Sequence, residues 1–245
     1  MIEKVNWYKD WFNSPFYHVL YQNRDDRDAR KLIDNLIKEL KPYFESEFLD
    51  LACGKGRHAI YLNSKGYKVC GVDMSENSIK EARKFENDSL EFFIGDMRLP
   101  LFPGRFDYIL NLFTSFGYFE NPADNLKTLI AVKKMLKPNG IFVLDFFNAV
   151  SVVKNLIPQE SIIIDDIRFD IKRNYDGKLV SKEINFSHKG QNYYFTERVE
   201  ALMKNDFEDL FNLAGFEIVD FRGDYNLNPY EFEKSERLII LAKNS

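Results

Sequence analysis

Between Phe48 and about Asn148, short apolar runs alternate with longer amphipathic stretches, and this alternation constrains the fold more than any other feature of the sequence. Strands that alternate with helices form βαβ units, in which the strands are parallel and the helices cover the sheet. The pattern therefore predicts an α/β fold with a mostly parallel sheet. The expected strands cover residues 48–52, 67–73, 90–96, 106–113 and 140–147, and the expected helices cover 57–65, 75–86 and 122–137.

The segments outside this alternation have different patterns of apolar and polar residues. Residues 1–45 open with many aromatic residues and continue with Leu and Ile at helical spacing, which predicts an N-terminal helical cap. Residues 151–202 have no helix-length pattern, but alternate apolar and polar residues around an Asp176-Gly177 turn predict a three-stranded antiparallel β-meander. A helix at 204–213 and strands at 216–221 and 237–243 close the chain. We therefore divide it into a cap (1–45), a core (46–150 and 203–245) and an inserted β lid (151–202).

Composition excludes several classes of protein. The 245 residues carry a net charge of −4, with 45% hydrophobic and 29% charged residues, as in an ordinary globular domain. The mild acidity argues against a nucleic-acid partner, and no apolar run is long enough to span a bilayer. The first residues lack the apolar stretch of a signal peptide, and two cysteines make no disulfide framework. We expect a cytoplasmic protein without a nucleic-acid or membrane partner, whose oligomeric state the composition leaves open.

Ligand-type residues follow three successive expected strands. Gly54 and Gly56 lie between a strand and a helix, where glycines allow a tight turn and close approach of a ligand to the helix N-terminus. Asp73 follows the second strand, where a carboxylate can accept hydrogen bonds from a ribose diol. Asp96 follows the third strand and could accept a hydrogen bond from an adenine amine while Met97 packs on the ring. Because open α/β sheets bind ligands at the carboxyl ends of their strands, the three features together predict an adenosine-containing ligand.

The glycine turn alone does not say which adenosine ligand is bound. Gly54, Gly56 and Ala59 also satisfy the G-x-G-x-x-A pattern of a dinucleotide-binding fold. Asp50, inside the first strand, argues against a dinucleotide, because an acid there suits a ligand with a positive charge such as an amino-acid ammonium group.

On these residues the sequence resembles the class I S-adenosylmethionine-dependent methyltransferases over about residues 45–148 and 204–243. The matching motifs are DLACGKG (50–56), GVDMS (71–75), GDM (95–97), FDYI (106–109), LKPNGI (136–141), and AGFEIVDF (214–221) with RLIILAK (237–243). The resemblance implies S-adenosylmethionine as cofactor and a Rossmann-like three-layer α/β/α sandwich. Its seven-stranded, mostly parallel sheet has the order 3-2-1-4-5-7-6 with strand 7 antiparallel. The candidate cofactor-binding residues are Asp50, Ala52, Gly54, Gly56, Arg57, Asp73, Met74, Asp96, Met97 and Leu112.

The implied reaction is an in-line displacement at a sulfonium methyl, in which the protein aligns the reactants and excludes water. The loop after the fourth strand, 111–119, lies where this family places acceptor contacts. Its start, Asn111-Leu112-Phe113-Thr114, lacks the prolines of nucleic-acid amino-methyltransferases, and Asn111 argues against the metal of catechol-type relatives despite Asp145 on the fifth strand. We expect a small-molecule acceptor, with transfer to oxygen or nitrogen favoured over carbon.

Aromatic residues make up 16% of the chain and gather at 7–21, at 113–119 and at 193–195, all expected to border one cleft. The sequence thus predicts an enclosed, partly aromatic acceptor pocket. A general base is needed only if the acceptor loses a proton during transfer, so no catalytic residue is assigned, and His18 and Tyr118 are the candidates. Candidate acceptor-binding residues are Tyr17, His18, Phe116, Tyr118 and Arg198.

Alternative interpretations stay open at this point. Core packing is the alternative role for Phe116, and an exposed strand position is the alternative for Arg198. The whole chain could also be a nicotinamide-dependent oxidoreductase on a similar sheet, or a non-catalytic methyltransferase-like protein that only binds the cofactor.

Overall fold

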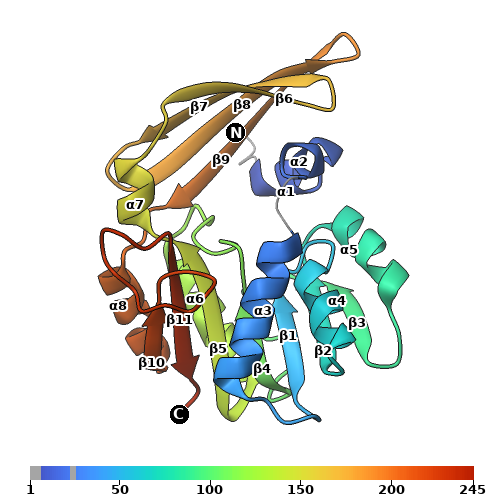
Figure 1. The fold of residues 1–245 in the computed structure, drawn as a ribbon, viewed down its shortest axis with the longest axis vertical. Helices are drawn as coiled ribbons and strands as arrows, with labels where there is room; N and C mark the ends of the chain where they lie inside the picture. Colours follow the sequence, from blue (N-terminus) through green and yellow to red (C-terminus); the bar gives the residue numbers. More distant parts are fainter. Residues whose placement is uncertain (1–6, 23–25) are drawn as a thin grey trace.

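A seven-stranded sheet forms the centre of the protein in the computed structural model, which describes residues 7–22 and 26–245 (Figure 1). In spatial order the strands are β10 (Glu217–Arg222), β11 (Arg237–Lys243), β5 (Leu136–Phe147), β4 (Phe106–Asn111), β1 (Glu47–Leu51), β2 (Lys68–Asp73) and β3 (Leu90–Ile94). Strands β1 to β5 pair in parallel, whereas β11 runs antiparallel to both β5 and β10. The predicted strand order and fold class are confirmed.

Helices cover both faces of this sheet. One face carries α3 (Asp26–Leu40), α4 (Arg57–Ser64) and α5 (Glu76–Ala82), the last followed by a short 3-10 turn, η1 (Arg83–Phe85). The other face carries α6 (Ala123–Met135) and α8 (Lys204–Ala214). Side chains alternate between the faces along each strand, so Phe48 of β1 packs with the α3 layer and Leu49 packs with the α6 layer. Among the described residues, no helix is both long and apolar enough to cross a membrane.

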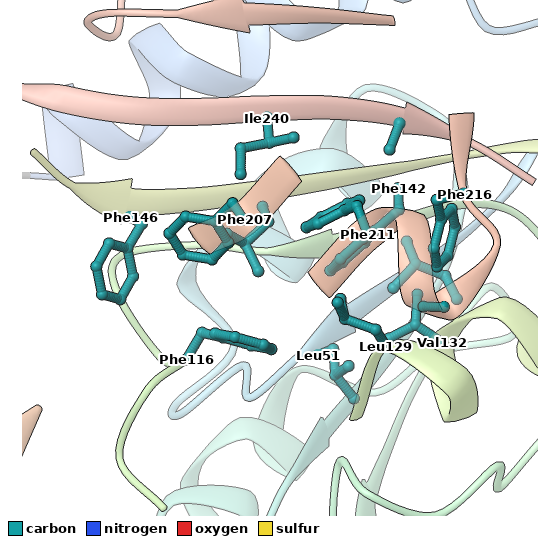
Figure 2. Packing of buried hydrophobic residues seen from close by; sticks show 14 of the residues in the cluster. Leu51, Phe116, Leu129, Val132, Phe142, Phe146, Phe207, Phe211, Phe216 and Ile240 are labelled. Carbon is teal, nitrogen blue, oxygen red and sulfur yellow. The ribbon is translucent and has the colours of Figure 1, made fainter. Parts of the chain in front are cut away.

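Phenylalanines dominate the layer between the sheet and α8, as Figure 2 shows. Phe211 stacks on Phe142 of β5 with ring centroids 5.9 Å apart, and Phe207 meets Phe146 edge-on at 5.1 Å. All four side chains are fully buried, and burial of one such ring contributes about 1.5–3 kcal/mol. This layer gives the sheet a rigid support below the ends of β4 and β5.

A second, four-stranded antiparallel sheet, the lid, follows the short helix α7 (Ala149–Lys154). Its strands are β6 (Gln159–Ile164), β7 (Ile167–Tyr175), β8 (Leu179–His188) and β9 (Gln191–Glu200), in that order. The predicted meander had three strands, so β6 is a correction. Asp165 and Asp166 make the turn between β6 and β7 with φ of 48° and 60°, a left-handed conformation that Asp tolerates without the glycine that marks the next hairpin.

The cap helices α1 (Trp7–Phe12) and α2 (Pro15–Leu20) lie between the lid and the central sheet (Figure 1). Trp11 is fully buried and packs on Phe195 of β9 with centroids 4.6 Å apart, and Phe16 packs on Phe186 of β8 at 4.7 Å. The aromatic start of the chain thus supplies the hydrophobic core of the lid. The expected cap also included residues 1–6 and 23–25, which lie outside the described residues.

Candidate active site

A pocket of about 440 Å³ lies at the carboxyl ends of the central strands, below the cap. Its wall combines the glycine turn after β1, the residues after β2 and β3, the loop after β4 and the two cap helices. This volume lies within the range of about 300–1,000 Å³ that is typical of small-molecule sites. The pocket stands where the three predicted ligand-type segments meet.

Left-handed backbone conformations shape the glycine turn. Ala52, Gly54 and Gly56 have φ of 61°, 55° and 80°. A Cβ on Gly54 would meet nothing within 4 Å, so this glycine is required by its φ and leaves open space in the pocket wall. A Cβ on Gly56 would lie 2.6 Å from the Phe92 ring, so Gly56 is required by packing as well as by its φ, and it stands behind the wall as the N-cap of α4. The two glycines therefore have different roles.

Asp50 supports this turn from behind. Its side chain is buried, lies outside the pocket wall, and accepts a hydrogen bond from the Ala59 N–H at 3.1 Å. Burial raises the pKa of Asp50 to about 7. The carboxylate fixes the first turn of α4, and the predicted direct contact with a ligand ammonium stays a prediction.

Asp73 joins the end of β2 to the glycine turn. The Gly54 N–H donates to its Oδ2 and the Ser75 N–H donates to its Oδ1, both at 2.8 Å. A carboxylate has about four lone-pair sites, so Asp73 can also accept from the two hydroxyls of a ribose. Burial raises its pKa, while the backbone hydrogen bonds act in the opposite direction. Met74 follows in the pocket wall.

Asp96 is held by an arginine that sequence reasoning did not consider. Arg98 donates from Nη2 to Asp96 Oδ2 at 2.6 Å and from Nη1 to Asp124 Oδ2 at 2.6 Å, and its guanidinium lies 5.1 Å from the Phe119 ring centroid. Burial raises the pKa of Asp96, but the hydrogen bonds from Arg98 outweigh burial and hold the pKa below its usual value. The ionised acid lies in the pocket wall beside Met97.

Together these groups fit the chemistry of S-adenosylmethionine. Asp73 and Asp96 could accept from the hydroxyl and amine donors of its adenosine half. The N-terminal turn of α4 and Arg57, whose guanidinium lies 4.8 Å from the Phe113 ring centroid, could bind its carboxylate. Leu112 lies beside them in the wall, which also contains Ala52.

Three of the five predicted acceptor contacts line the pocket: Tyr17, His18 and Tyr118. The Tyr118 ring packs against Trp7 and Phe12 of the cap with centroids 5.6 Å and 5.4 Å away. Burial lowers the pKa of His18 to about 4, and the nearby Lys55 acts in the same direction. His18 is therefore neutral near pH 7 and can accept a hydrogen bond.

The other two predicted contacts lie elsewhere. Phe116 is fully buried, 5.9 Å from the Phe207 ring centroid in the core cluster (Figure 2). It follows the left-handed residues Phe113 and Thr114 and lies outside the pocket wall. Arg198 is exposed on β9, since strand alternation turns its neighbour Glu197 inward instead. The aromatic residues at 193–195 also stay outside the wall, where Tyr193 and Phe195 pack on the cap and Tyr194 is exposed.

A polar cluster that sequence reasoning missed ties the cap to the lid. Glu197 Oε1 accepts from Trp11 Nε1 at 2.6 Å and from Tyr21 Oη at 2.5 Å, and Lys182 Nζ donates to Tyr21 Oη at 2.5 Å. Lys182 and Glu197 are register partners on β8 and β9, and Tyr21 lines the pocket. The sequence did hold a sign of this cluster. Alternate residues of a strand share a face, so the charged Glu197 falls on the same face of β9 as the apolar Phe195.

Strand order, glycine turn and strand-end acids define a Rossmann-like α/β enzyme fold with a nucleoside-cofactor site. Comparison with known proteins gives the family. The family model of a methyltransferase domain matches residues 48–140. The YqeM protein of Bacillus subtilis, which carries a methyltransferase name, is 28% identical over 214 residues, covering 82% of this chain and 85% of that one.

Two further matches agree. A glycine/sarcosine N-methyltransferase of Halorhodospira halochloris is 33% identical over 127 residues, covering 49% of this chain and 47% of its own. The fold matches the crystal structure of an S-adenosylmethionine-dependent methyltransferase from Clostridium acetobutylicum with a TM-score of 0.79 and 23% identity, covering 93% of this chain and 95% of that one. The chain is a class I S-adenosylmethionine-dependent methyltransferase, and S-adenosylmethionine is its cofactor. These matches give no support to the nicotinamide-dependent or non-catalytic alternatives.

Proposed function

We propose that this enzyme transfers the methyl group of S-adenosylmethionine to the nitrogen of a small-molecule amine. Bound S-adenosylmethionine supplies an activated methyl group on a sulfonium. The chain has to hold the amine in line with it, keep water out, and stabilise positive charge as it moves from sulfur to nitrogen.

The acceptor side of the pocket suits a positively charged transition state. The rings of Tyr8, Phe12, Tyr17, Phe113 and Tyr118 all line the wall. The face of an aromatic ring attracts a cation, and the attraction grows where water is excluded. Such rings favour an acceptor that becomes cationic on methylation, as an amine does.

The choice of nitrogen over oxygen rests on which residues of the pocket wall could act as a base. Among the described residues, the carboxylates of the wall are Asp73 and Asp96, both at the strand ends that suit the adenosine half. His18, with a pKa of about 4, is too weak a base to take a proton from a hydroxyl group. A neutral amine needs no such base, because its lone pair attacks before any proton leaves. His18 can then orient the amine by accepting an N–H hydrogen bond.

The named activity of the Halorhodospira relative, methylation of the nitrogen of glycine and sarcosine, supports the same choice. We assign the ribose to Asp73, the adenine amine to Asp96 and the methionine carboxylate to Arg57. In this assignment the core (46–150 and 203–245) holds the cofactor, and the first two helices of the cap (1–45) cover the acceptor. The lid (151–202) packs on those helices from the side away from the pocket. Activity in the cytoplasm and without nucleic acid or membrane stays a prediction.

A panel of matched acceptors tests the proposal. Each amine, such as glycine or an amino sugar, is paired with the hydroxyl compound of the same skeleton, and formation of S-adenosylhomocysteine is followed with and without enzyme. We expect turnover with one or more amines and none above background with their hydroxyl partners. Faster turnover of a hydroxyl compound than of its amine would contradict transfer to nitrogen.

A further inference from the structure

Two consecutive residues of the loop after β4 adopt a costly backbone conformation at the pocket. Phe113 and Thr114 have φ of 68° and 59°. A left-handed conformation is strained for a residue other than glycine. Both residues line the pocket, and the Arg57 guanidinium lies over the face of the Phe113 ring. This turn persists only because its surroundings hold it.

One acid accepts both backbone N–H groups of the turn. Asp145 of β5 has no exposed surface. Its Oδ2 accepts from the Phe113 N–H at 2.9 Å, and its own carbonyl oxygen accepts from the Thr114 N–H at 3.0 Å. Asp145 thus fixes the direction of both peptide groups.

An arginine completes the hold from the neighbouring strand. Arg237, the first residue of β11, donates from Nε to Asp145 Oδ1 at 2.7 Å and from Nη2 to Thr114 Oγ1 at 2.9 Å. Tyr225 adds a third contact, with its hydroxyl 3.2 Å from Asp145 Oδ2. A buried carboxylate is stable only with such partners, and the planar guanidinium reaches the acid and the turn at once.

We propose that Asp145 and Arg237 are positioning residues that hold the strained turn at Phe113 and Thr114 and thereby set the acceptor side of the pocket. Neither residue lines the pocket, so their effect passes through the turn. The cofactor acids lie elsewhere, Asp73 at the end of β2 and Asp96 just after β3, and have no bond to this pair among the described hydrogen bonds. Loss of the pair should therefore disturb acceptor geometry first, and should reach the cofactor only weakly, through the contact of the Phe113 ring with Arg57.

Amide hydrogen exchange on the full chain with bound S-adenosylhomocysteine tests this without an acceptor. In Arg237→Gln we expect exchange at Phe113 and Thr114 to rise about tenfold or more, with little change at Gly54 and Ser75. The dissociation constant of S-adenosylhomocysteine should change much less than activity does, because the turn reaches the cofactor site only through the Phe113–Arg57 contact. The control is Arg105→Gln, which removes ion pairs with Glu47 and Glu91 at the opposite end of the sheet and should leave the turn protected.

Activity is the second readout and rests on the proposed function. With the fastest amine of the acceptor panel, kcat/KM should fall about tenfold or more in Arg237→Gln. If no amine is methylated, the proposed function fails, while the exchange measurement still decides the role of the pair.

If Arg237→Gln does not fold, Arg237→Lys takes its place. Lysine keeps the charge beside Asp145 but lacks the second donor that reaches the Thr114 hydroxyl. We therefore expect exchange to rise more at Thr114, whose side chain loses its anchor, than at Phe113, whose N–H still donates to the Asp145 carboxylate. Unchanged exchange at the turn would overturn the proposal. So would a loss of S-adenosylhomocysteine affinity as large as the loss of activity.

Discussion

Replacing Asp73 with alanine should weaken the binding of S-adenosylhomocysteine by about 1–3 kcal/mol, or about 5- to 150-fold in the dissociation constant. The carboxylate stands in the pocket wall with each oxygen held at 2.8 Å by a backbone N–H, so it is oriented before a ligand arrives. Hydrogen bonds from ribose hydroxyls to an oriented, charged acceptor are worth more than neutral ones, and alanine removes them all.

The same substitution also frees the N–H groups of Gly54 and Ser75, so cofactor affinity and fold stability have to be measured separately. Isothermal titration gives the affinity for S-adenosylhomocysteine, and thermal unfolding without ligand gives the stability. Asp107→Ala is the matched control, because Asp107 accepts from the Glu47 N–H and pairs with Lys137 far from the pocket.

We expect Asp107→Ala to lose stability and keep its affinity, whereas Asp73→Ala loses affinity. A dissociation constant within about twofold of the original for Asp73→Ala would remove Asp73 from the ribose role. An equal loss of affinity in both variants would show that the effect comes from the fold.

Three further predictions concern the turn, the cap and pH. Gly56→Ala should destabilise the fold by about 1–3 kcal/mol, because the new Cβ would lie 2.6 Å from Phe92, and Phe92→Leu in the same chain should restore part of the loss in a urea titration. Glu197→Gln should loosen the cap, because Lys182 loses its countercharge; a shift of tryptophan emission to longer wavelength would report it, and unchanged emission would speak against it. Burial holds the pKa of His58 at about 3, below the ordinary 6.5, so its contribution to stability is complete above pH 6.5 and declines as pH falls toward 3. His58→Gln should make the melting temperature less sensitive to acid across that window, and an equal slope in both proteins would refute the assignment.

The central sheet could be predicted because its signals are local. Strand and helix periods alternate within short windows, and glycines and acids mark the strand ends, so the residues that meet at the pocket could be named from the chain alone. Even here, the spacing of the two glycines in the sequence does not show that they have different roles. Both glycines have a positive φ, but Gly54 faces the pocket, whereas Gly56 also leaves room for the Phe92 ring.

The acceptor side was less predictable because distant residues set its geometry. The left-handed turn at 113–114 is held by Asp145 and Arg237 and precedes Phe116, which packs in the core. No pattern near Phe116 reports on an arginine more than a hundred residues away. On β9 a shift of one residue exchanges the faces, so Arg198 points outward and Glu197 inward. The lid strand β6 was missed because its turn to β7 contains no glycine.

Transfer of the methyl group to nitrogen is the central claim, and isotope labelling tests it most directly. The enzyme is incubated with carbon-labelled S-adenosylmethionine and the small-molecule fraction of a cell extract, and the labelled methyl groups formed are identified by NMR and mass spectrometry. The account predicts that label appears as N-methyl groups on small amines and is lost when the enzyme is omitted. Label found on oxygen or carbon, with none on nitrogen, would contradict it.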